Sequence, residues 1–566
     1  MPHHSLSFLD LSVTATLHEM VRFSSRRRKA RIVILVLLVF FTIAAGYILR
    51  SHFQHDNPPR APDRHSSKSN KHNDWWLEFF NRLSSTRVTA HGVKFHGKAP
   101  AINWKPDTVD SVDRPQLFEL SDDDQTKLFE SHSSFVHQLP LFASHLPFDA
   151  NTTGIVTTVG ARNFGQAISL VLMTRRTGSH LPIQIILDSR SPWVDMVCSS
   201  TMPRFNTTCV FLEELWAGIH QRLPKFTSFQ WKTISIIAST FQNVLFLDAD
   251  CLPVRNPDAI FDLGSEPFTS AGFITYPDFW TSSISPLFYR IAGDLEVPAI
   301  SSRSSSESGV MVYNKARHAD ILLLAAYYNY NGPGHYYPML TQHGAGEGDK
   351  ETFLQAALVL EALRKQGVYR QPREWMKPGV GVKKGYWDVK TIPSVLGRSE
   401  PKSKWRGMFI KQMDPMEDYR AVMAALEKAR NSTSETEIRH PTRASQHAGR
   451  SDEDSFLTDS NFLATVGNLT LEYDRSRVMF FHHNGVKPDF TRITDPDSGL
   501  VATDEKGKHL RMWEDPGWII CDFGRDIEKM LWQDSIEIYC HAEMARFKQL
   551  RRVCLRMQAI CGEVYA

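Results

Sequence analysis

The sequence predicts an α/β fold with a mixed, largely parallel sheet. Short apolar runs rich in Val, Ile and Leu alternate with helical stretches after residue 151. Strands that are apolar along their whole length belong to sheets buried on both faces. An uncharged apolar run near the N-terminus further predicts one membrane-spanning helix before this domain.

The predicted membrane anchor covers 32–49, eighteen residues without a charge. At about 1.5 Å per residue they reach roughly 27 Å, enough for a thin bilayer. A basic run at 26–31 precedes them, so we expect a cytoplasmic tail over 1–31 and a lumenal body, as in a single-pass type II protein. A cleaved signal peptide is the alternative, but the run is long and starts late for one. A stem and N-terminal extension is assigned to 50–150, and its first part, 51–73, has the composition of a flexible stem.

Beyond the N-terminus the chain is nearly neutral. The first 50 residues hold seven Lys and Arg against two Asp and Glu, while the remainder holds 58 against 60. A body without a basic excess offers no electrostatic footprint for nucleic acid. Four sequons follow the anchor, where N-glycosylation is possible. They are Asn151, Asn206, Asn431 and Asn468.

Seven cysteines fit a large domain with a few disulfides. Cys198 and Cys209 are close enough in sequence to close a short loop. The four cysteines within 521–561 are enough for two more bridges. This leaves Cys251, which follows an apolar strand, as a buried free thiol.

A lumenal domain is assigned to 151–566. Its predicted strands lie at 155–160, 183–187 and 244–248, and its predicted helices at 165–175, 227–241 and 351–364. Trp75, Trp76, Phe79 and Phe80 predict an earlier helix that packs on something. Residues 428–456 have almost no large apolar side chains and predict a disordered insertion.

The strongest local signal is the pair Asp248 and Asp250 at the end of the apolar run 243–247. On an extended backbone, side chains two residues apart share a face. Two carboxylates at the carboxyl end of a strand can hold a hard divalent cation, and open α/β sheets bind ligands there. An acidic loop without any metal is the alternative reading.

Further polar residues follow in a fixed order. Ser308 and Gly309 open a predicted strand, Asp349 precedes the helix at 351–364, and His482 and Lys487 follow another apolar strand. Each has a purely structural explanation: a glycine bulge, a helix N-cap, or surface polar residues after a strand. Lys232 lies 16 residues before Asp248, and a lone lysine there is normally solvated.

Taken together, these motifs resemble the fungal Golgi α-mannosyltransferases of glycosyltransferase family 71, which form α-1,2 or α-1,3 linkages. The resemblance covers about 151–490 and rests on four sequence blocks. These are VLFLDADCLPVRNPDAIF, SSESGVMVYNK, GEGDKETF and FFHHNGVKPDF. A more distant similarity to glycogenin-like retaining glycosyltransferases involves the Lys before Asp-x-Asp, the Ser-Gly-Val strand and the late His-x-x-Gly.

The resemblance implies a GT-A fold and a role for each motif residue. Mn²⁺ would be held by Asp248, Asp250 and His482. The donor, GDP-mannose, would contact Gly160, Arg162, Lys232 and Lys487. The acceptor, a mannose-containing glycan, would lie at Ser308 and Gly309, with Asp349 as the catalytic candidate. The implied product is an α linkage formed with retention, at the Golgi membrane.

Two other functions stay open at this stage. A transferase of the same fold can use another nucleotide sugar, and a membrane-anchored glycan-binding protein can retain the fold without catalysis. A glycosidase fits less well, because its two carboxylates lie across the sugar rather than side by side. Since neighbours on a strand point to opposite faces, only one histidine of the pair can reach the ion, and the spacing to Gly485 favours His482 over His483.

Overall fold

The computed structural model describes most of the chain between residues 64 and 565. The described segments are 64–104, 114–219, 223–370, 387–388, 391–395, 408–433, 476–504, 506–513 and 516–565. They belong to two units, 1–71 and 72–566, and of the first only the start of helix α2 is described. No helix within these segments combines the length and the apolar character that crossing a bilayer requires. The predicted tail and anchor, 1–49, lie outside the described residues.

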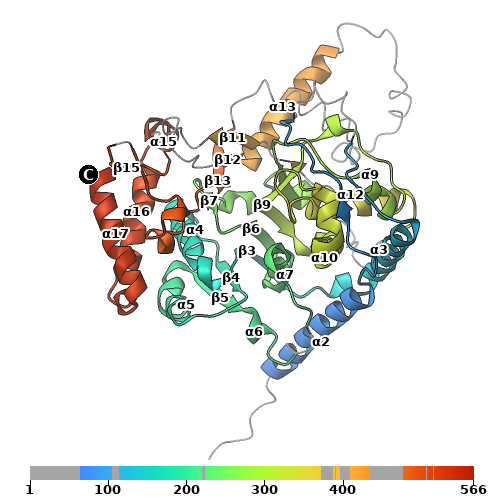
Figure 1. Ribbon diagram of the computed structural model, residues 1–566, viewed down its shortest axis with the longest axis horizontal. Coiled ribbons are helices and arrows are strands. Elements are labelled where there is room, and N and C mark those ends of the chain that lie inside the picture. Colours follow the sequence, from blue (N-terminus) through green and yellow to red (C-terminus); the bar gives the residue numbers. More distant parts are fainter. Residues whose placement is uncertain are drawn as a thin grey trace, which may run out of the picture. The chain divides into compact units, whose positions relative to one another are not determined.

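A seven-stranded mixed sheet forms the centre of the second unit (Figure 1). In spatial order its strands are β10 (Trp387–Asp388), β8 (Phe273–Pro277), β9 (Ser306–Asn314), β6 (Phe241–Leu247), β3 (Asp149–Val159), β4 (Ile183–Leu187) and β5 (Thr207–Phe211). All neighbours are parallel except β9, which runs antiparallel to both β6 and β8. The predicted α/β class with a mixed, largely parallel sheet is therefore confirmed.

The sequence of β6 explains why helices cover both faces of this sheet. Leu245 and Leu247 point into one hydrophobic cluster, while Val244 and Phe246 point into another, and all four are 0% exposed. Because strand side chains alternate between faces, a strand that is apolar at every position must be covered on both sides.

Different helices cover the two faces. On the Leu245 side lie α4 (Phe164–Arg176), α16 (Ile527–Tyr539) and α17 (Lys548–Val564). On the Val244 side lie α7 (Trp231–Ala238), α10 (Lys315–Tyr330) and α12 (Thr352–Lys365), with α2 (Arg64–Ser85) and α3 (Asp122–Phe142) beyond them. Figure 1 shows the first group beside the C-terminus and the second group at the opposite side of the sheet.

The second sheet is small and antiparallel, and it brings a late segment of the chain to the end of β6. Its order is β11 (Thr391–Val395), β12 (Met408–Met413), β13 (Val478–His483) and β7 (Cys251–Pro253). In the register of β13 and β7, His482 lies opposite Cys251. Since β7 begins four residues after β6 ends, β13 is held beside the turn that carries Asp248 and Asp250.

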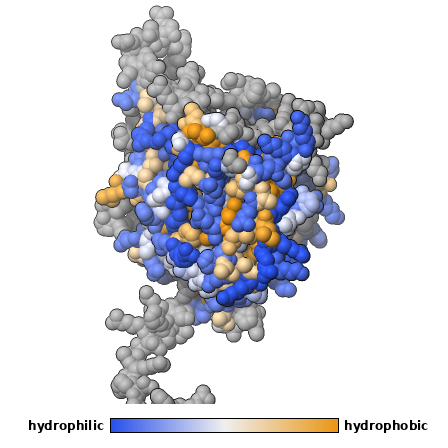
Figure 2. Space-filling view, turned by 90° about the vertical axis from the view of Figure 1, so that its left-hand side faces the viewer, coloured by the Kyte–Doolittle hydropathy of each residue, from blue (hydrophilic) through white to orange (hydrophobic). Residues whose placement is uncertain are grey.

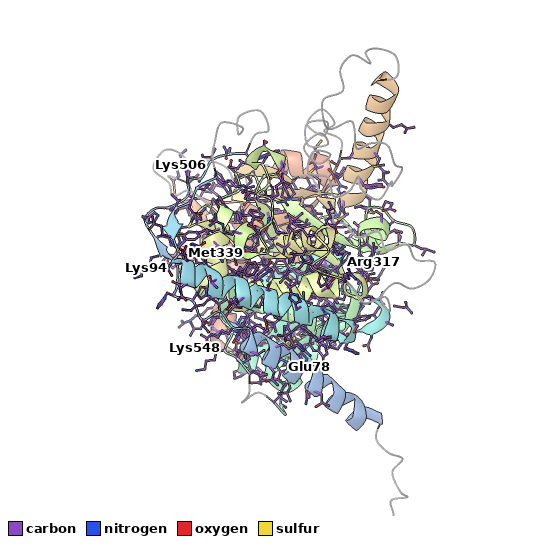
Figure 3. The ribbon with its side chains drawn as sticks, turned by 90° about the vertical axis from the view of Figure 1, so that its right-hand side faces the viewer. Glu78, Lys94, Arg317, Met339, Lys506 and Lys548 are labelled. Carbon is purple, nitrogen blue, oxygen red and sulfur yellow. A yellow bond between two sulfur atoms is a disulfide. The ribbon has the colours of Figure 1, made fainter. Side chains whose placement is uncertain are left out.

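The described residues of 74–104 and 114–146 belong to the folded body, so the boundary predicted at 150 is wrong. Trp76 and Phe79 of α2 are fully buried in the same hydrophobic cluster as α10 and α12. Arg82 of α2 donates a hydrogen bond of 3.1 Å to Gln138 of α3, and Figure 3 shows these two helices side by side. Residues 64–73, predicted as part of a flexible stem, are helical. The aromatic pattern that predicted a packed helix was the correct guide.

Two further expectations are corrected in part. Cys198 and Cys209 form the predicted disulfide, and Cys251 is a buried free thiol. At the C-terminus only Cys540 and Cys554 are bridged, whereas Cys521 on α15 (Pro516–Phe523) and Cys561 on α17 are free. The predicted disordered insertion 428–456 begins inside helix α13 (Pro415–Thr433), and its part beyond 433 lies outside the described residues.

The remaining elements are short. They are α5 (Pro192–Met196), α6 (Leu212–Leu215), α8 (Phe268–Ala271), α9 (Pro286–Ile291), α11 (Tyr337–Thr341), and the strand pairs β1 (Lys94–Phe95) with β2 (Phe118–Glu119) and β14 (Ala502–Thr503) with β15 (His509–Leu510). The helix predicted at 227–241 ends at Ala238, because β6 already begins at Phe241.

A matched pair of leucine substitutions tests the placement of the core. Leu245→Ala should lower stability by about 2–5 kcal/mol, because it removes a fully buried side chain from the central strand. Leu141→Ala on α3, where the side chain is 62% exposed, should change it by less than about 0.5 kcal/mol. Thermal denaturation of both variants measures the difference, and equal melting temperatures would contradict the core described above.

Candidate active site

A cavity of about 790 Å³ opens at the edge of the large sheet where β3, β4 and β6 end and β9 begins. Its position agrees with the general rule that open α/β sheets bind ligands beyond the carboxyl ends of their strands. The lining side chains include seven carboxylates, three lysines and one histidine. They are Asp188, Asp248, Asp250, Asp278, Glu307, Glu347, Asp349, Lys232, Lys350, Lys487 and His482.

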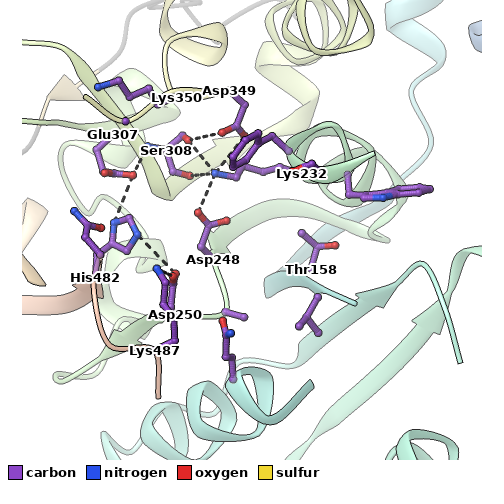
Figure 4. A pocket seen from close by; sticks show the side chains of 18 of the residues that line it. Thr158, Lys232, Asp248, Asp250, Glu307, Ser308, Asp349, Lys350, His482 and Lys487 are labelled. Atoms are coloured by element: carbon purple, nitrogen blue, oxygen red, sulfur yellow. Dashed lines mark hydrogen bonds and ion pairs between the residues drawn. The ribbon is translucent and has the colours of Figure 1, made fainter. Parts of the chain in front are cut away.

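Lys232 lies at the centre of this cluster (Figure 4). Its Nζ donates hydrogen bonds to Oδ2 of Asp248 at 2.9 Å and to the hydroxyl and carbonyl of Ser308 at 2.9 and 3.1 Å. It also lies 3.2 Å from Oδ2 of Asp349. With 6% of its surface exposed, Lys232 is a buried partner of two carboxylates, and the alternative of a solvated lysine is wrong.

The start of α7 explains how Lys232 reaches this place. A capping box between Thr227 and Gln230 begins a short helical segment, and Lys232 lies in the first turn of α7. The neighbouring positions 234, 236 and 237 are apolar and bury the helix against the sheet. The lysine is therefore carried inward with the helix.

The charges of this cluster shift one another's titration. Burial opposes a charge on Lys232, but the carboxylates of Asp248 and Asp349 outweigh it and raise the lysine pKa. Burial raises the pKa of Asp349 to about 6, against the effect of Lys232. Burial, together with repulsion from Asp250, also raises the pKa of Asp248. Such perturbed groups in a cavity are typical of functional sites.

Asp248 and Asp250 lie in a turn, so the expectation of an extended backbone is wrong. The carbonyl of Asp248 accepts the N–H of Cys251 at 2.8 Å, which closes the turn between β6 and β7. As a result the two carboxylates have different partners. Asp248 pairs with Lys232, whereas Asp250 pairs with Lys487.

The two histidines at the end of β13 point in opposite directions. Nε2 of His482 lies 3.7 Å from Oδ1 of Asp250, and its Nδ1 lies 3.4 Å from Oε1 of Glu307. His483 turns away from the cavity: its Nδ1 donates to the carbonyl of Asp250 at 3.0 Å, and its Nε2 accepts from the indole of Trp513 at 2.8 Å. Alternation along β13 thus puts His482 in the cavity and makes His483 a support of the turn.

Electrostatics separate the two imidazoles as well. Burial alone would lower the pKa of His482, but the acidic groups around it, Glu307 among them, raise that pKa above its usual range. Burial lowers the pKa of His483 to about 4. Lys487 and His482 outweigh burial at Asp250 and lower the pKa of its carboxyl.

Two of the three residues expected to hold a divalent cation, Asp250 and His482, come together in one group of potential ligands, whereas Asp248 is not part of that group. Ligand atoms of Asp250, Cys251 and His482 lie within 4.8 Å of one another, and Nδ1 of His482 has no hydrogen-bond partner among the described residues. Burial raises the pKa of the Cys251 thiol to about 12, so it stays protonated and is a poor ligand. The excess of carboxylates over lysines in the wall provides the oxygen donors that hard cations prefer.

Two of the residues predicted from the sequence lie elsewhere. Gly160 lines the cavity, but Arg162 lines a neighbouring one, because the 3₁₀ turn Ala161–Asn163 directs it away. Gly309 does not line the cavity either. Its carbonyl accepts the N–H of Asp248 at 2.8 Å, and a Cβ there would lie 2.7 Å from Sγ of Cys251. Gly309 therefore allows β9 to approach the turn closely.

Asp349 is not the N-cap of the following helix. Helix α12 begins at Thr352 with Glu351 as its N-cap residue, and no side chain caps it. The Asp349 carboxylate points instead to Lys232 and to the hydroxyl of Ser308, 3.5 Å away. The structural alternative for this residue is therefore wrong.

Sequence reasoning missed several lining residues. Glu307 accepts the backbone N–H groups of Ser308 and Gly309 at 2.8 and 2.9 Å and lies against His482. Lys350 is 3.2 Å from Asp278, which follows β8. Glu307 and Lys350 stand beside residues that were singled out, so adjacency was the one available signal. No sequence signal pointed to Asp278, because only the order of the strands in the sheet brings it to the cavity.

Comparison with known proteins adds a family. Residues 152–304 and 299–371 match the model described as "Mannosyltransferase putative". Alpha-1,2-mannosyltransferase MNN2 of Saccharomyces cerevisiae is 32% identical over 276 residues, which cover 43% of this chain and 46% of MNN2. Alpha-1,2-mannosyltransferase MNN5 of S. cerevisiae is 25% identical over 600 residues, which cover 94% of each chain. The chain is similar to these proteins, each of which is an α-1,2-mannosyltransferase.

The homology is unevenly distributed along these relatives. The alignments span about half the length of MNN2 and of MNN23 from Candida albicans, 46% and 53%, but nearly all of MNN5. The family model contains Lys232, Asp248 and Asp349, whereas His482 and Lys487 lie beyond its end. In this chain a later segment thus meets the matched region at one cavity.

Solved structures give a much weaker similarity. Glycosyltransferase GlyE of Streptococcus pneumoniae TIGR4 is 12% identical with a TM-score of 0.21, covering 42% of this chain and 46% of GlyE. Galactosyltransferase LgtC is 12% identical with a TM-score of 0.24, covering 36% and 69%. TM-scores this low carry no argument, so the architecture is described from the sheet of this chain itself.

Gly309→Ala tests how closely β9 and the turn are packed. The new methyl group would meet Sγ of Cys251 at 2.7 Å and Cε1 of His482 at 2.8 Å, so the imidazole must move. We expect Mn²⁺ binding, measured by calorimetry, to weaken about 10- to 100-fold. Gly562→Ala, where nothing lies within 4 Å of the new atom, is the control and should bind Mn²⁺ normally. Unchanged binding in Gly309→Ala would remove His482 from the cation site.

Proposed function

We propose that the protein is a metal-dependent α-mannosyltransferase that moves mannose from GDP-mannose to a mannose residue of a glycan. The observation that carries this proposal is the cavity in which Lys232, Asp248, Asp250, Asp349 and His482 converge at the edge of an α/β sheet. Homology to α-1,2-mannosyltransferases supports the sugar and the linkage. The edge position of the acidic turn supports a GT-A type of nucleotide-sugar fold.

The cation would be Mn²⁺, held by Asp248, Asp250 and His482. A bound divalent cation neutralises the charge that develops on a departing diphosphate. Lys232 and Lys487 occupy the two carboxylates in this structure, and both amines line the cavity. Once the cation takes the carboxylates, the amines can pair with the phosphate oxygens of the donor.

The nucleoside end of the donor would lie where β3 and β4 end. Gly160, Asn163, Gln166 and Asp188 line this part of the cavity, and all but the glycine carry hydrogen-bonding side chains. The volume of about 790 Å³ is within the usual range for a small-molecule ligand site. Gly160 stays in the proposed donor site, and Arg162 leaves it.

Asp349 is the proposed catalytic residue. It stands with Ser308 beside Lys232, so the sugar would lie between this group and the cation. A carboxylate held by a lysine can stabilise a cationic sugar or orient the incoming hydroxyl. Since the donor is α-linked, an α-linked product means retention of configuration.

The acceptor would lie against the aromatic side of the same cavity. Phe229 lines it and is 47% exposed, and Trp231 and Trp280 line it as well. An exposed aromatic face is a natural platform for the C–H groups of a sugar ring. The position is tight, because a Cβ on Gly348 would lie 2.8 Å from the Phe229 ring. This aromatic side replaces Ser308 and Gly309 as the proposed acceptor site.

The proposed location is the Golgi membrane, with a single-pass type II topology and a lumenal body. The support is the sequence of the anchor at 32–49 and the placement of two sequons. Asn151 and Asn206 are both exposed, as an N-glycosylation acceptor must be. Asn468 and the side chain of Asn431 lie outside the described residues.

The assay combines purified protein, Mn²⁺, a mannobiose acceptor and a panel of nucleotide sugars. We expect transfer from GDP-mannose alone, with an α-1,2 linkage seen by NMR. Asp248→Asn and addition of EDTA should each reduce transfer by at least about 100-fold. Asp262→Asn, an exposed aspartate outside the cavity, is the matched control and should retain activity.

Three results would contradict this proposal. Transfer from a UDP-sugar in preference to GDP-mannose would favour a different donor. Binding of the glycan without any transfer would favour a non-catalytic lectin. Full transferase activity in EDTA would show that the reaction needs no metal.

Phe229→Ala tests the acceptor platform separately from the donor site. Loss of the stacking face should raise the KM for the mannobiose about tenfold, equivalent to about 1.4 kcal/mol, while hydrolysis of GDP-mannose without acceptor stays unchanged. Phe129→Ala on α3 is the matched control, since that ring is 42% exposed but lies outside the cavity. An equal effect on donor hydrolysis would place Phe229 at the donor instead.

A further inference from the structure

A second cavity, of about 1060 Å³, borders the first one. Successive residues of the same two segments line the two cavities. Gly160 and Asp188 line the active-site cavity, while the next residues, Ala161 and Ser189, line the second. A hydrogen bond of 3.3 Å from the N–H of Ala161 to the hydroxyl of Ser189 fixes this partition. The opposite wall is formed by the start of α17.

The charged side chains of the second cavity are all cationic. They are Arg162, Arg190, Arg492, Lys548 and Arg552. Arg190 is engaged by Asp195, Glu213 and Glu214, and Arg492 by Asp495, so these two are neutralised. The other three are exposed and have no ion pair or hydrogen bond among the described residues.

The excess of cations in this cavity is unusual for this chain. The chain holds 65 Lys and Arg against 62 Asp and Glu, so an average cavity would hold both signs. The neighbouring active-site cavity has seven carboxylates and three lysines. The second cavity, in contrast, is lined by cations and by no carboxylate of the described residues. Figure 2 looks onto the side of the molecule that α17 occupies, and hydrophilic residues predominate there.

The beginning of α17 runs against the usual pattern of a helix. Acidic residues are favourable in a first turn and cations are not, because of the helix dipole. Here the first turn has no acidic residue, and Lys548, Arg551 and Arg552 lie within the first five positions. Local rules broken in this way are expected at functional sites, where a ligand supplies the missing partner.

We propose that this cavity binds the phosphate group of a phosphorylated sugar, beside the donor and separate from it. Three unpaired cations match the two negative charges and three acceptor oxygens of a phosphomonoester. Trp193 and Phe547 contribute aromatic surface to the same walls, which suits a sugar carrying the phosphate. A concave site of this kind fits a compact ligand better than it fits a flat membrane. This inference does not depend on the donor sugar of the proposed reaction.

Calorimetry with the whole protein in EDTA tests the site, using mannose 6-phosphate, inorganic phosphate and mannose as probes. We expect one mannose 6-phosphate to bind and mannose not to bind. The double variant Arg162→Gln, Arg552→Gln should weaken binding at least about tenfold. Arg551→Gln is the matched control on the same helix, because that exposed guanidinium donates to the carbonyl of Ala545 and lies outside the cavity. Its affinity should equal that of the unaltered protein.

The competing outcomes are distinct. If inorganic phosphate binds as tightly as the sugar phosphate, the phosphate site stands and free phosphate is its source. The titration is repeated without EDTA in saturating GDP and Mn²⁺. If binding of mannose 6-phosphate is then lost, the phosphate enters the donor cavity and the proposal is overturned. The proposal is also overturned if mannose 6-phosphate shows no binding at concentrations up to about 10 mM. The proposal is overturned as well if mannose 6-phosphate does not bind but anionic vesicles bind in a way that requires Arg162 and Arg552. That result would identify a membrane surface as the ligand. Melting temperatures of the variants should match, because neither altered side chain has a partner to lose.

Discussion

The rest of the site depends on the hydrogen bonds and ion pairs of the buried Lys232 ammonium group. It joins the end of β6 through Asp248, the start of β9 through Ser308, and the segment before α12 through Asp349. Without a cation between them, the buried carboxylates would repel one another in a region of low dielectric. The lysine therefore allows acidic residues from distant parts of the chain to gather at one sheet edge.

A second network supports the acidic turn from behind. His483 donates to the carbonyl of Asp250 and accepts from Trp513, and the backbone N–H groups of Met512 and Trp513 are held by the buried carboxylate of Glu528. Glu528 lies on α16, outside the segment that matches the family model. The C-terminal helices thus support the acidic turn without lining the cavity, in the way that outer residues commonly orient functional side chains.

The sequence predicted those features that depend on local pattern. Strands β4 and β6 and helices α4 and α12 were found within a few residues, because their apolar periodicity is unbroken. Asp248, Asp349 and His482 were singled out because each follows or precedes such an element. Lys232 was singled out by its 16-residue spacing to Asp248 and by the family resemblance, since a lone lysine there is normally solvated. The extended geometry of the acidic pair was wrong, because the chain must turn after Asp248 to enter β7. Arg162 was misplaced for a similar reason, since a 3₁₀ turn follows β3.

Features that depend on long-range packing were not predictable. Glu307 and Asp278 reach the cavity only because β9 lies between β6 and β8, an order that no local pattern reveals. The same holds for the N-terminal segment, whose aromatic helix α2 belongs to the core. The pairing of Cys540 with Cys554, and not with its neighbours, depends on how α16 and α17 pack.

A crystal structure with GDP and Mn²⁺, with anomalous scattering recorded at the manganese edge, tests the central claim most directly. The account predicts one manganese peak bound by Asp248, Asp250 and His482, with Lys232 or Lys487 turned from the carboxylates to the phosphates. A manganese peak elsewhere, or a nucleotide bound while both lysines keep their carboxylate partners, would contradict it.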